Sequence, residues 1–264
     1  MSVRNAKPFR RGKGFRPRNT SRGTQSLGDG GVILYGWHTV TAALANPDRR
    51  IRKLWATENA ARRLAEGGVN LPVPPELVRP DFIAARLTPD AVHQGLLAEA
   101  DPLPGRTLSH LPAARLVLAL DQITDPHNVG AILRTAAAFA VGAVITTARY
   151  SPEATGVLAK SASGALELVP ILVATNLARA LEELKEQAFQ VVGLDGEAPD
   201  DLSALALAPP LALVLGAEGT GLRQKTRATC DRLARLSLPG AVKSLNVSNA
   251  AAVALYIATS RLQP

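Results

Sequence analysis

Residues 211–222 have the sequence LALVLGAEGTGL, an apolar run that passes directly into a glycine-rich loop. The continuously apolar part, Leu211–Leu215, is typical of a parallel strand that is covered on both faces. Other runs of this kind alternate with predicted helices from about residue 112 onward. This alternation predicts an α/β fold with a mostly parallel sheet, in which ligands bind at the carboxyl ends of the strands. The loop Gly216–Leu222 stands at one of these ends, so we expect it to contact a ligand.

The chain divides by composition into four parts. We expect a disordered basic arm over residues 1–30, a small α/β domain over 31–100, a linker over 101–112 and the parallel-sheet domain over 113–264. In the small domain we predict strands at 32–35, 51–56 and 95–98 and helices at 37–45, 58–66 and 81–87, the last capped by Asp81. In the large domain, predicted helices start at Asn128, at Ser151 and at Asn246 or Ser248.

The positive charge of the chain is concentrated in the arm. Residues 1–24 hold 8 basic side chains and no acid, which equals the net charge of +8 of the whole chain. Glycine and proline oppose a helix here, so we expect a disordered segment that attracts RNA by releasing counterions, with Phe9 and Phe15 free to stack on bases. A solubilising tail and a mitochondrial transit peptide are the alternatives. The candidate RNA-binding residues are Arg4, Lys7, Arg10, Arg11, Lys13, Arg16 and Arg18.

Several classes of protein are disfavoured by composition. The one cysteine, Cys230, excludes an internal disulfide and offers no metal cluster, and we expect it to be a small buried or half-buried residue. No apolar run approaches the roughly 18 to 20 residues of a membrane span. We therefore expect a cytoplasmic protein with neither a metal nor a membrane partner.

The glycines of the loop do not by themselves identify the ligand that the loop binds. Gly216 and Gly221 have P-loop spacing, but Leu222 and Arg223 follow where a lysine and a Ser or Thr should bind phosphate and magnesium. NTP hydrolysis is therefore not expected. Glu218 would repel phosphates, and it favours a cofactor with hydroxyls, an amine or a cationic centre. The structural alternative is that the Glu218 carboxylate accepts hydrogen bonds from the amides of its own loop.

Two more segments follow predicted strand ends. Asp125-Pro-His-Asn128 starts a helix whose free amides suit a phosphate or carboxylate. Arg134 lies among apolar neighbours, which suggests a partly buried guanidinium with a specific anionic partner, a structural ion pair being the alternative. Ser244-Leu-Asn246-Val-Ser248 places small polar groups at a helix entrance, where simple capping is the alternative. We expect His127 to cap or pack rather than to act as a base.

Together these segments resemble the motifs of the SpoU/TrmH family of S-adenosylmethionine-dependent RNA ribose 2′-O-methyltransferases. The resemblance covers about residues 115–260, and it depends on Asp125–Arg134, Lys160–Ala165, Gly216–Leu222 and Ser244–Ser248. Residues 32–100 are similar to the ribosomal-protein-like RNA-binding domain of the RlmB-like ribosomal RNA branch. The matching landmarks there are Tyr35-Gly-Trp-His38 and Val92-His-Gln-Gly95.

The resemblance implies a SPOUT fold with a trefoil knot, a homodimer and S-adenosylmethionine as cofactor. It implies a cofactor pocket formed by Gly216, Leu236 and Leu245, with Leu215, Gly221 and Leu238 beside them. It implies a catalytic set of Asn128, Arg134, Glu218, Asn246 and Ser248, in which Arg134 activates the ribose hydroxyl. Leu236-Ser237-Leu238 departs from the Ile-Pro-Met that is frequent in the family, which leaves the geometry of that loop open.

The expected activity is thus methylation of a ribose in RNA, with a guanosine of 23S ribosomal RNA as the leading substrate. The small domain favours the ribosomal RNA branch over the first alternative, a tRNA ribose methyltransferase. The second alternative is a catalytically silent RNA-binding assembly factor, and the intact Asn128, Arg134, Glu218 and Asn246 count against it.

Overall fold

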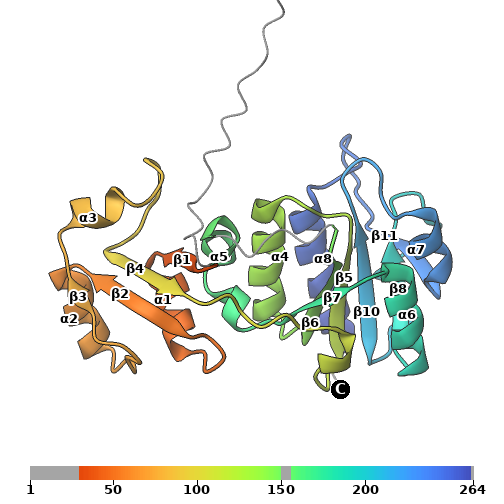
Figure 1. Ribbon diagram of the computed structural model, residues 1–264. Helices are drawn as coiled ribbons and strands as arrows, with labels where there is room; N and C mark the ends of the chain where they lie inside the picture. Colours follow the sequence, from red (N-terminus) through yellow and green to blue (C-terminus); the bar gives the residue numbers. More distant parts are fainter. Residues whose placement is uncertain (1–29, 150–155, 263–264) are drawn as a thin grey trace, which may run out of the picture.

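The computed structural model describes residues 30–149 and 156–262, which form two sheets joined by a linker (Figure 1). The predicted basic arm and the predicted helix start at Ser151 lie outside the described residues. Within them, no helix is long and apolar enough to cross a membrane.

The first sheet has four strands in the order β1-β4-β2-β3, and we call this part the N-terminal domain. β4 is antiparallel to both of its neighbours, whereas β3 is parallel to β2. Its elements are β1 (Val32–Tyr35), α1 (Trp37–Ala45), β2 (Ile51–Ala56), α2 (Glu58–Glu66), β3 (Glu76–Leu77), α3 (Pro80–Ala84) and β4 (Leu96–Ala100).

The predicted elements of this domain are largely confirmed. α1, β2 and α2 have the predicted bounds, and Thr57 caps α2 by accepting a hydrogen bond from the backbone N–H of Ala60. The prediction for α3 was wrong in detail, because the helix begins at Pro80 and Arg79, not Asp81, is its N-cap residue. The two exposed residues of β3 were not predicted, since so short a strand has no periodicity to detect.

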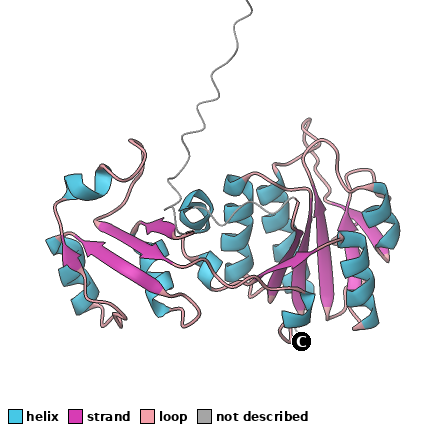
Figure 2. Cartoon of the chain, in the orientation of Figure 1, coloured by secondary structure: helices cyan, strands magenta, loops and turns pink. Residues whose placement is uncertain are grey.

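The second sheet has seven parallel strands in the order β7-β6-β5-β10-β8-β11-β9. Helices cover both of its faces (Figure 2). Its strands are β5 (Leu116–Asp121), β6 (Ala143–Thr147), β7 (Ile171–Ala174), β8 (Gln190–Leu194), β9 (Asp200–Asp201), β10 (Leu211–Gly216) and β11 (Arg232–Arg235). Its helices are α4 (Pro126–Ala138), α5 (Gly156–Ala162), α6 (Leu177–Glu186), α7 (Gln224–Thr229) and α8 (Val247–Arg261), with 3-10 turns at Leu108–His110 and Ala165–Glu167.

The continuous apolar runs follow from burial on both faces, as the sequence predicts. Along β5, Leu116, Leu118 and Leu120 face the core shared with α4, α5 and α8, whereas Val117 and Ala119 face the core under α6. Because successive side chains of a strand point to opposite faces, a strand between two helix layers is apolar at every position.

The start of α4 differs from the prediction. Asp125, rather than Asn128, is the N-cap, and its carboxylate accepts hydrogen bonds from the backbone N–H groups of His127 and Asn128. Pro126 occupies the first helical position, where its missing N–H costs nothing. The amides that were expected to be free for a phosphate are therefore occupied. The prediction for α8 is confirmed, since Asn246 is its N-cap and accepts from the N–H of Ser248.

The N-terminal domain is docked on the sheet domain by a buried ion pair. Nη2 of Arg49 lies 2.6 Å from Oε1 of Glu167, and both side chains are only 1% exposed. Asn46 donates a further hydrogen bond of 2.7 Å to Glu167, and Arg49 donates one of 2.8 Å to the carbonyl of Asp101. Apolar side chains of both domains join one core cluster, so the two domains are fixed against each other.

Candidate functional site

One cavity at the carboxyl end of the parallel sheet gathers all the residues predicted to bind a cofactor. It has a volume of about 450 Å³ and lies between the loop after β10, the loop before α8 and the ends of β8 and β11. The predicted residues that line it are Leu215, Gly216, Gly221, Leu236, Leu238 and Leu245. Three segments that lie apart in the sequence therefore form the walls of a single space.

The glycine loop folds back on itself at the mouth of this cavity. A Cβ atom on Gly216 would stand 2.2 Å from the carbonyl carbon of Gly221, so no other residue fits there without moving the loop. Gly221 itself has a φ of +63°, in the left-handed region that favours glycine. These glycines expose backbone groups at the cavity wall and let a ligand approach them closely.

Carboxylates of the chain occupy the two helix starts beside the loop. Asp121, which is fully buried, accepts hydrogen bonds of 2.9 Å from the N–H of Arg223 and 2.7 Å from its Nε. Glu218 accepts one of 3.0 Å from the N–H of Val247 at the start of α8. Helix starts that already hold a carboxylate do not receive a phosphate, which agrees with the expectation that the loop does not bind NTP.

Four of the five predicted catalytic residues form one hydrogen-bonded cluster around Asn246. Its amide nitrogen donates to Oδ1 of Asn128 at 3.0 Å and to Oε1 of Glu218 at 2.6 Å. Its amide oxygen accepts from the hydroxyl of Ser248 at 2.5 Å. Glu218 also lines the cofactor cavity, so the polar cluster and the cavity share a wall.

Arg134 is not part of this cluster, and the prediction that it is partly buried was wrong. The residue is exposed on α4, and among the described residues its side chain has no hydrogen-bond or ion-pair partner. Neither the predicted anionic partner nor the structural ion pair is found in this part of the chain. An exposed guanidinium on the helix that also carries Asn128 is available to an anionic substrate.

The cavity also contains charged residues that sequence reasoning missed. Asp195 and Glu197 follow β8, and Arg227 on α7 pairs with Asp195 at 2.6 Å. The signal was present, because Asp195 comes directly after the apolar strand β8 and the carboxyl ends of parallel strands meet at one edge.

Ser237, the residue that left the geometry of its loop open, lies beside the carboxylate of Asp201. Hydrogen bonds from Ser203 and then from Ser237 lower the pKa of Asp201 to about 2. Ser237 thus has a partner, which accounts for a polar residue at this position.

The other singled-out residues have structural surroundings. His127 is exposed and shares a hydrogen bond of 3.2 Å with the hydroxyl of Ser161. Burial raises the pKa of the Cys230 thiol to about 12, which makes it unreactive, as expected for a half-buried cysteine. No group of His, Cys, Asp and Glu side chains in the described ranges is arranged to hold a metal ion.

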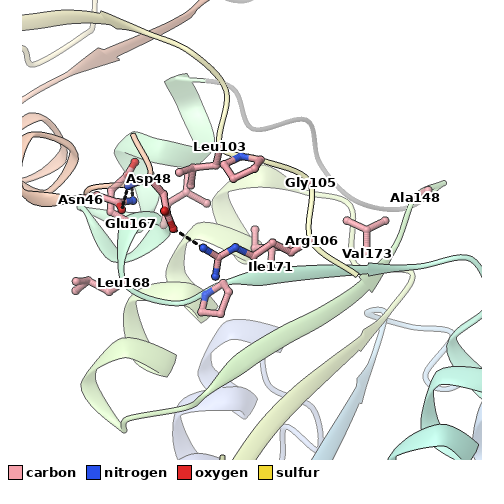
Figure 3. Close-up of a pocket in the computed structure, with 13 residues that line it drawn as sticks. Asn46, Asp48, Leu103, Gly105, Arg106, Ala148, Glu167, Leu168, Ile171 and Val173 are labelled. Carbon is pink, nitrogen blue, oxygen red and sulfur yellow. Dashed lines mark hydrogen bonds and ion pairs between the residues drawn. The ribbon is translucent and has the colours of Figure 1, made fainter. Parts of the chain in front are cut away.

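A second cavity, of about 490 Å³, lies where the linker crosses between the domains (Figure 3). Its polar groups are paired with each other: Arg106 with Asp48, and Asn46 with Glu167. None of the predicted site residues lines it. We therefore assign this cavity to the contact between the two domains and not to a catalytic or binding site.

Comparisons with known proteins match both domains. Residues 115–256 match the SpoU rRNA Methylase family, and residues 33–105 match a domain described as RNA 2′-O ribose methyltransferase substrate binding. Two similar relatives are described as 23S rRNA (guanosine-2′-O-)-methyltransferase RlmB. The one from Pseudomonas putida is 39% identical over 87% of this chain and 96% of its own. The one from Pseudomonas aeruginosa is 40% identical over 84% of this chain and 94% of its own.

Solved structures share the fold over both domains. A putative RNA methyltransferase of the TrmH family from Porphyromonas gingivalis aligns with a TM-score of 0.72 and 27% identity, covering 88% of this chain and 91% of that one. The SpoU methyltransferase AviRb from Streptomyces viridochromogenes, solved with AdoMet, aligns with a TM-score of 0.73 over the same shares, and at 22% identity it supports the fold alone.

Proposed function

Because the chain belongs to the SpoU rRNA methylase family, we propose that it transfers a methyl group from S-adenosylmethionine to a ribose 2′-hydroxyl of 23S ribosomal RNA, at a guanosine. The observation that carries the proposal is the shared wall at Glu218, where the cofactor cavity meets the Asn246 cluster. Both RlmB relatives carry the guanosine-2′-O activity in their descriptions, and each covers both domains of this chain.

The residues of the cavity suit this cofactor. The side chains of Leu215, Leu236 and Leu245 offer apolar walls for a flat adenine, and the loop at Gly216 offers backbone groups. The carboxylates of Glu218 and Glu197 suit a ligand with an amine, hydroxyls and a positive sulfonium. When bound, S-adenosylmethionine supplies an electrophilic methyl group whose sulfur loses its charge on transfer, and a dry pocket favours such a step over water.

The hydroxyl that accepts the methyl group must lose a proton, and we propose that Arg134 assists without acting as the base. The pKa of a guanidinium exceeds about 12, so it is a poor proton acceptor. As an exposed cation it would bind a phosphate next to the ribose and stabilise the developing alkoxide. Asn128, Glu218, Asn246 and Ser248 would then position the ribose.

This role of Arg134 predicts a specific loss. Arg134→Ala should lower kcat for methyl transfer to RNA by roughly 10²-fold, with an unchanged Kd for S-adenosylmethionine. Arg179→Ala is the matched control, because Arg179 is also exposed and lies on α6 in an i,i+4 pair with Glu183. Single-turnover methylation with tritiated cofactor measures both. Full activity of the Arg134 variant would exclude the assigned role.

Two measurements separate the proposal from its alternatives. Calorimetric titration with S-adenosylmethionine tests for a cofactor site, and absence of binding would favour a silent assembly factor. Mapping of ribose methylation in total RNA, with and without the protein, distinguishes the substrates. A protein-dependent signal on a 23S guanosine supports the proposal, and one on tRNA alone would contradict it.

We also propose a homodimer with α8 at its interface. Val253 and Tyr256 on the outer face of α8 are 40% and 64% exposed, and Val242 before this helix is 73% exposed. Large apolar side chains at i and i+3 on one helix suit contact with a second copy. Sedimentation equilibrium should give twice the chain mass, and Tyr256→Arg should shift it to the monomer. A monomeric wild-type protein would contradict this assignment.

The remaining expectations stand as proposals. We propose four further properties together with this activity. They are the domain boundaries at 30, 100 and 112, the trefoil knot, the RNA-binding arm and the cytoplasmic location. The arrangement of β10, β11 and the loop before α8 around one cavity supports the knot.

A further inference from the structure

A shallow groove in the N-terminal domain combines an aromatic ring, a stacked cation and hydrogen-bonding side chains. It has a volume of about 310 Å³ and is lined by Trp37 at the start of α1, by Asn59 and Arg63 on α2, and by the loop 93–95. The guanidinium carbon of Arg63 lies 3.7 Å from the centre of the Trp37 ring. We call this the indole groove.

The charge of the groove suits a base better than a phosphate. Arg63 is the one Arg or Lys side chain that lines it, and no Asp or Glu lines it. Among the described residues Arg63 has no ion-pair partner, so it is held by the indole face rather than by an acid. Phosphate sites use convergent donors, whereas an indole and a guanidinium are the flat surfaces on which unpaired RNA bases stack.

The edge of the groove presents hydrogen-bond donors. Nδ1 of His93 accepts from the N–H of Gly95 at 3.1 Å, which leaves Nε2–H as the donor of the neutral ring. Oε1 of Gln94 accepts from the N–H of Trp37 at 2.9 Å, which leaves its NH2 group as a donor. These two donors favour a base with carbonyl acceptors, guanine or uracil, over adenine.

A short series of contacts connects the groove to the catalytic cluster. Nζ of Lys160 on α5 donates to the carbonyl of Val92 at 2.8 Å, and a Cβ on Gly36 would stand 2.4 Å from this nitrogen. Ser161, the next residue, shares a hydrogen bond with His127, which precedes Asn128. The groove and the site thus lie on either side of one interdomain contact.

We propose that the indole groove binds one unpaired guanine or uracil of the RNA, from a nucleotide close to the methylated ribose. The inference rests on the proposed RNA substrate. It assigns a specificity site to the N-terminal domain: the base is held there while the nucleotide to be methylated lies at the Asn246 cluster of the sheet domain.

Arg63→Gln and Arg62→Gln form a matched pair that tests the groove. Both remove one positive charge from exposed, adjacent positions of α2, but only Arg63 stacks on Trp37. With an unmodified 23S rRNA transcript and S-adenosylhomocysteine, Arg63→Gln should raise the Kd for RNA roughly tenfold, as loss of one stacked base does. It should leave the salt dependence close to that of Arg62→Gln. Equal Kd values for the two variants, or a lower salt slope in Arg63→Gln alone, would overturn the proposal.

Photocrosslinking tests the base directly. A transcript that contains 4-thiouridine or 6-thioguanosine should crosslink to the peptide that carries Trp37 or to the one that carries His93, and Trp37→Leu should remove the adduct. Crosslinks found only elsewhere would overturn the groove. Failure of the proposed function would be seen in a different measurement: the wild-type protein would neither bind S-adenosylmethionine nor methylate the transcript. The Kd for RNA and the crosslinks test the groove without any turnover.

Discussion

The side-chain amide of Asn246 joins three elements at one point. It contacts Asn128 on α4, Glu218 in the loop after β10 and Ser248 in the first turn of α8. Asn246 is exposed, so its hydrogen bonds contribute little to folding. Their effect is geometric: they fix the positions of three polar side chains that come from distant parts of the sequence.

Asn246→Ala should therefore damage activity much more than stability. Loss of the N-cap should cost about 1 kcal/mol of unfolding free energy, whereas misplacement of Asn128 and Glu218 should lower kcat by roughly 10²-fold. Asn70→Ala, at an exposed position outside the cluster, is the control. Urea unfolding and single-turnover methylation measure the two effects. A variant that loses stability but keeps its rate would show that Asn246 is only a cap.

The members of this cluster were predicted from the resemblance to the SpoU/TrmH family, whereas the environment of Arg134 was predicted wrongly. Spacing and residue type placed Asn128, Glu218 and Asn246 at strand ends, where the topology of a parallel sheet brings them together. Burial of Arg134 was inferred from its apolar neighbours Leu133 and Ala136, and that inference fails on a helix. Adjacent residues point about 100° apart, so the core-facing stripe leaves Arg134 on the outer side.

At the scale of elements, the start of α4 has the largest consequence for the site. Asp125 satisfies the first amides, and Asn128 is left free to turn its side chain toward Asn246. Had Asn128 been the cap, its oxygen would bind the backbone of α4 instead. The Asp-Pro pair signals this start, since a cap before a proline is the usual order, and the more conspicuous Asn128 obscured it.

Two cap variants separate the stability of a helix from its placement. Asp125→Ala and Asn176→Ala each remove one N-cap side chain, from α4 and α6, and each should cost about 1 kcal/mol of unfolding free energy. Only Asp125→Ala should also lower the rate of methyl transfer, because α6 packs on the face of the sheet away from α4. An equal loss of rate in both variants would assign the effect to general destabilisation.

The linker illustrates what composition cannot predict. Composition predicted a linker over residues 101–112, yet Arg106 forms a parallel bridge with Leu172 at the edge of the sheet. The N–H of Val173 donates to the carbonyl of Arg106 at 2.8 Å. Backbone pairing at a sheet edge depends on where the tertiary fold brings the segment, and no side-chain pattern encodes it.

At the scale of the whole molecule, the charge of residues 1–24 predicts how RNA affinity depends on salt. Deletion of this segment removes 8 positive charges and leaves a neutral remainder. Because each phosphate contact releases counterions, the deletion should weaken RNA binding and flatten the slope of log K against log salt. Filter binding across a salt series measures both. An unchanged slope would mean that the arm does not contact the RNA.

The relative position of the two domains depends on the Arg49–Glu167 pair. Breaking a buried pair leaves an uncompensated charge and costs about 3 to 5 kcal/mol, whereas replacement by apolar residues is often neutral. Glu167→Ala should thus destabilise the protein strongly, and Arg49→Met with Glu167→Leu should recover much of the loss. Glu183→Ala, which breaks an exposed pair, should cost less than 1 kcal/mol.

Kinetic constants should show whether the Arg49–Glu167 pair contributes to RNA binding as well as to stability. If the indole groove and the catalytic cluster act on one RNA, loosening the docking should raise KM for the transcript in Glu167→Ala while the Kd for S-adenosylmethionine, bound within the sheet domain, stays constant. The double variant keeps the contact apolar but removes the directional bonds to Asn46 and Asp101. The double variant should therefore recover most of the lost unfolding free energy, while its KM for the transcript stays above the wild-type value. A double variant with wild-type KM would show that packing alone sets the position of the two domains.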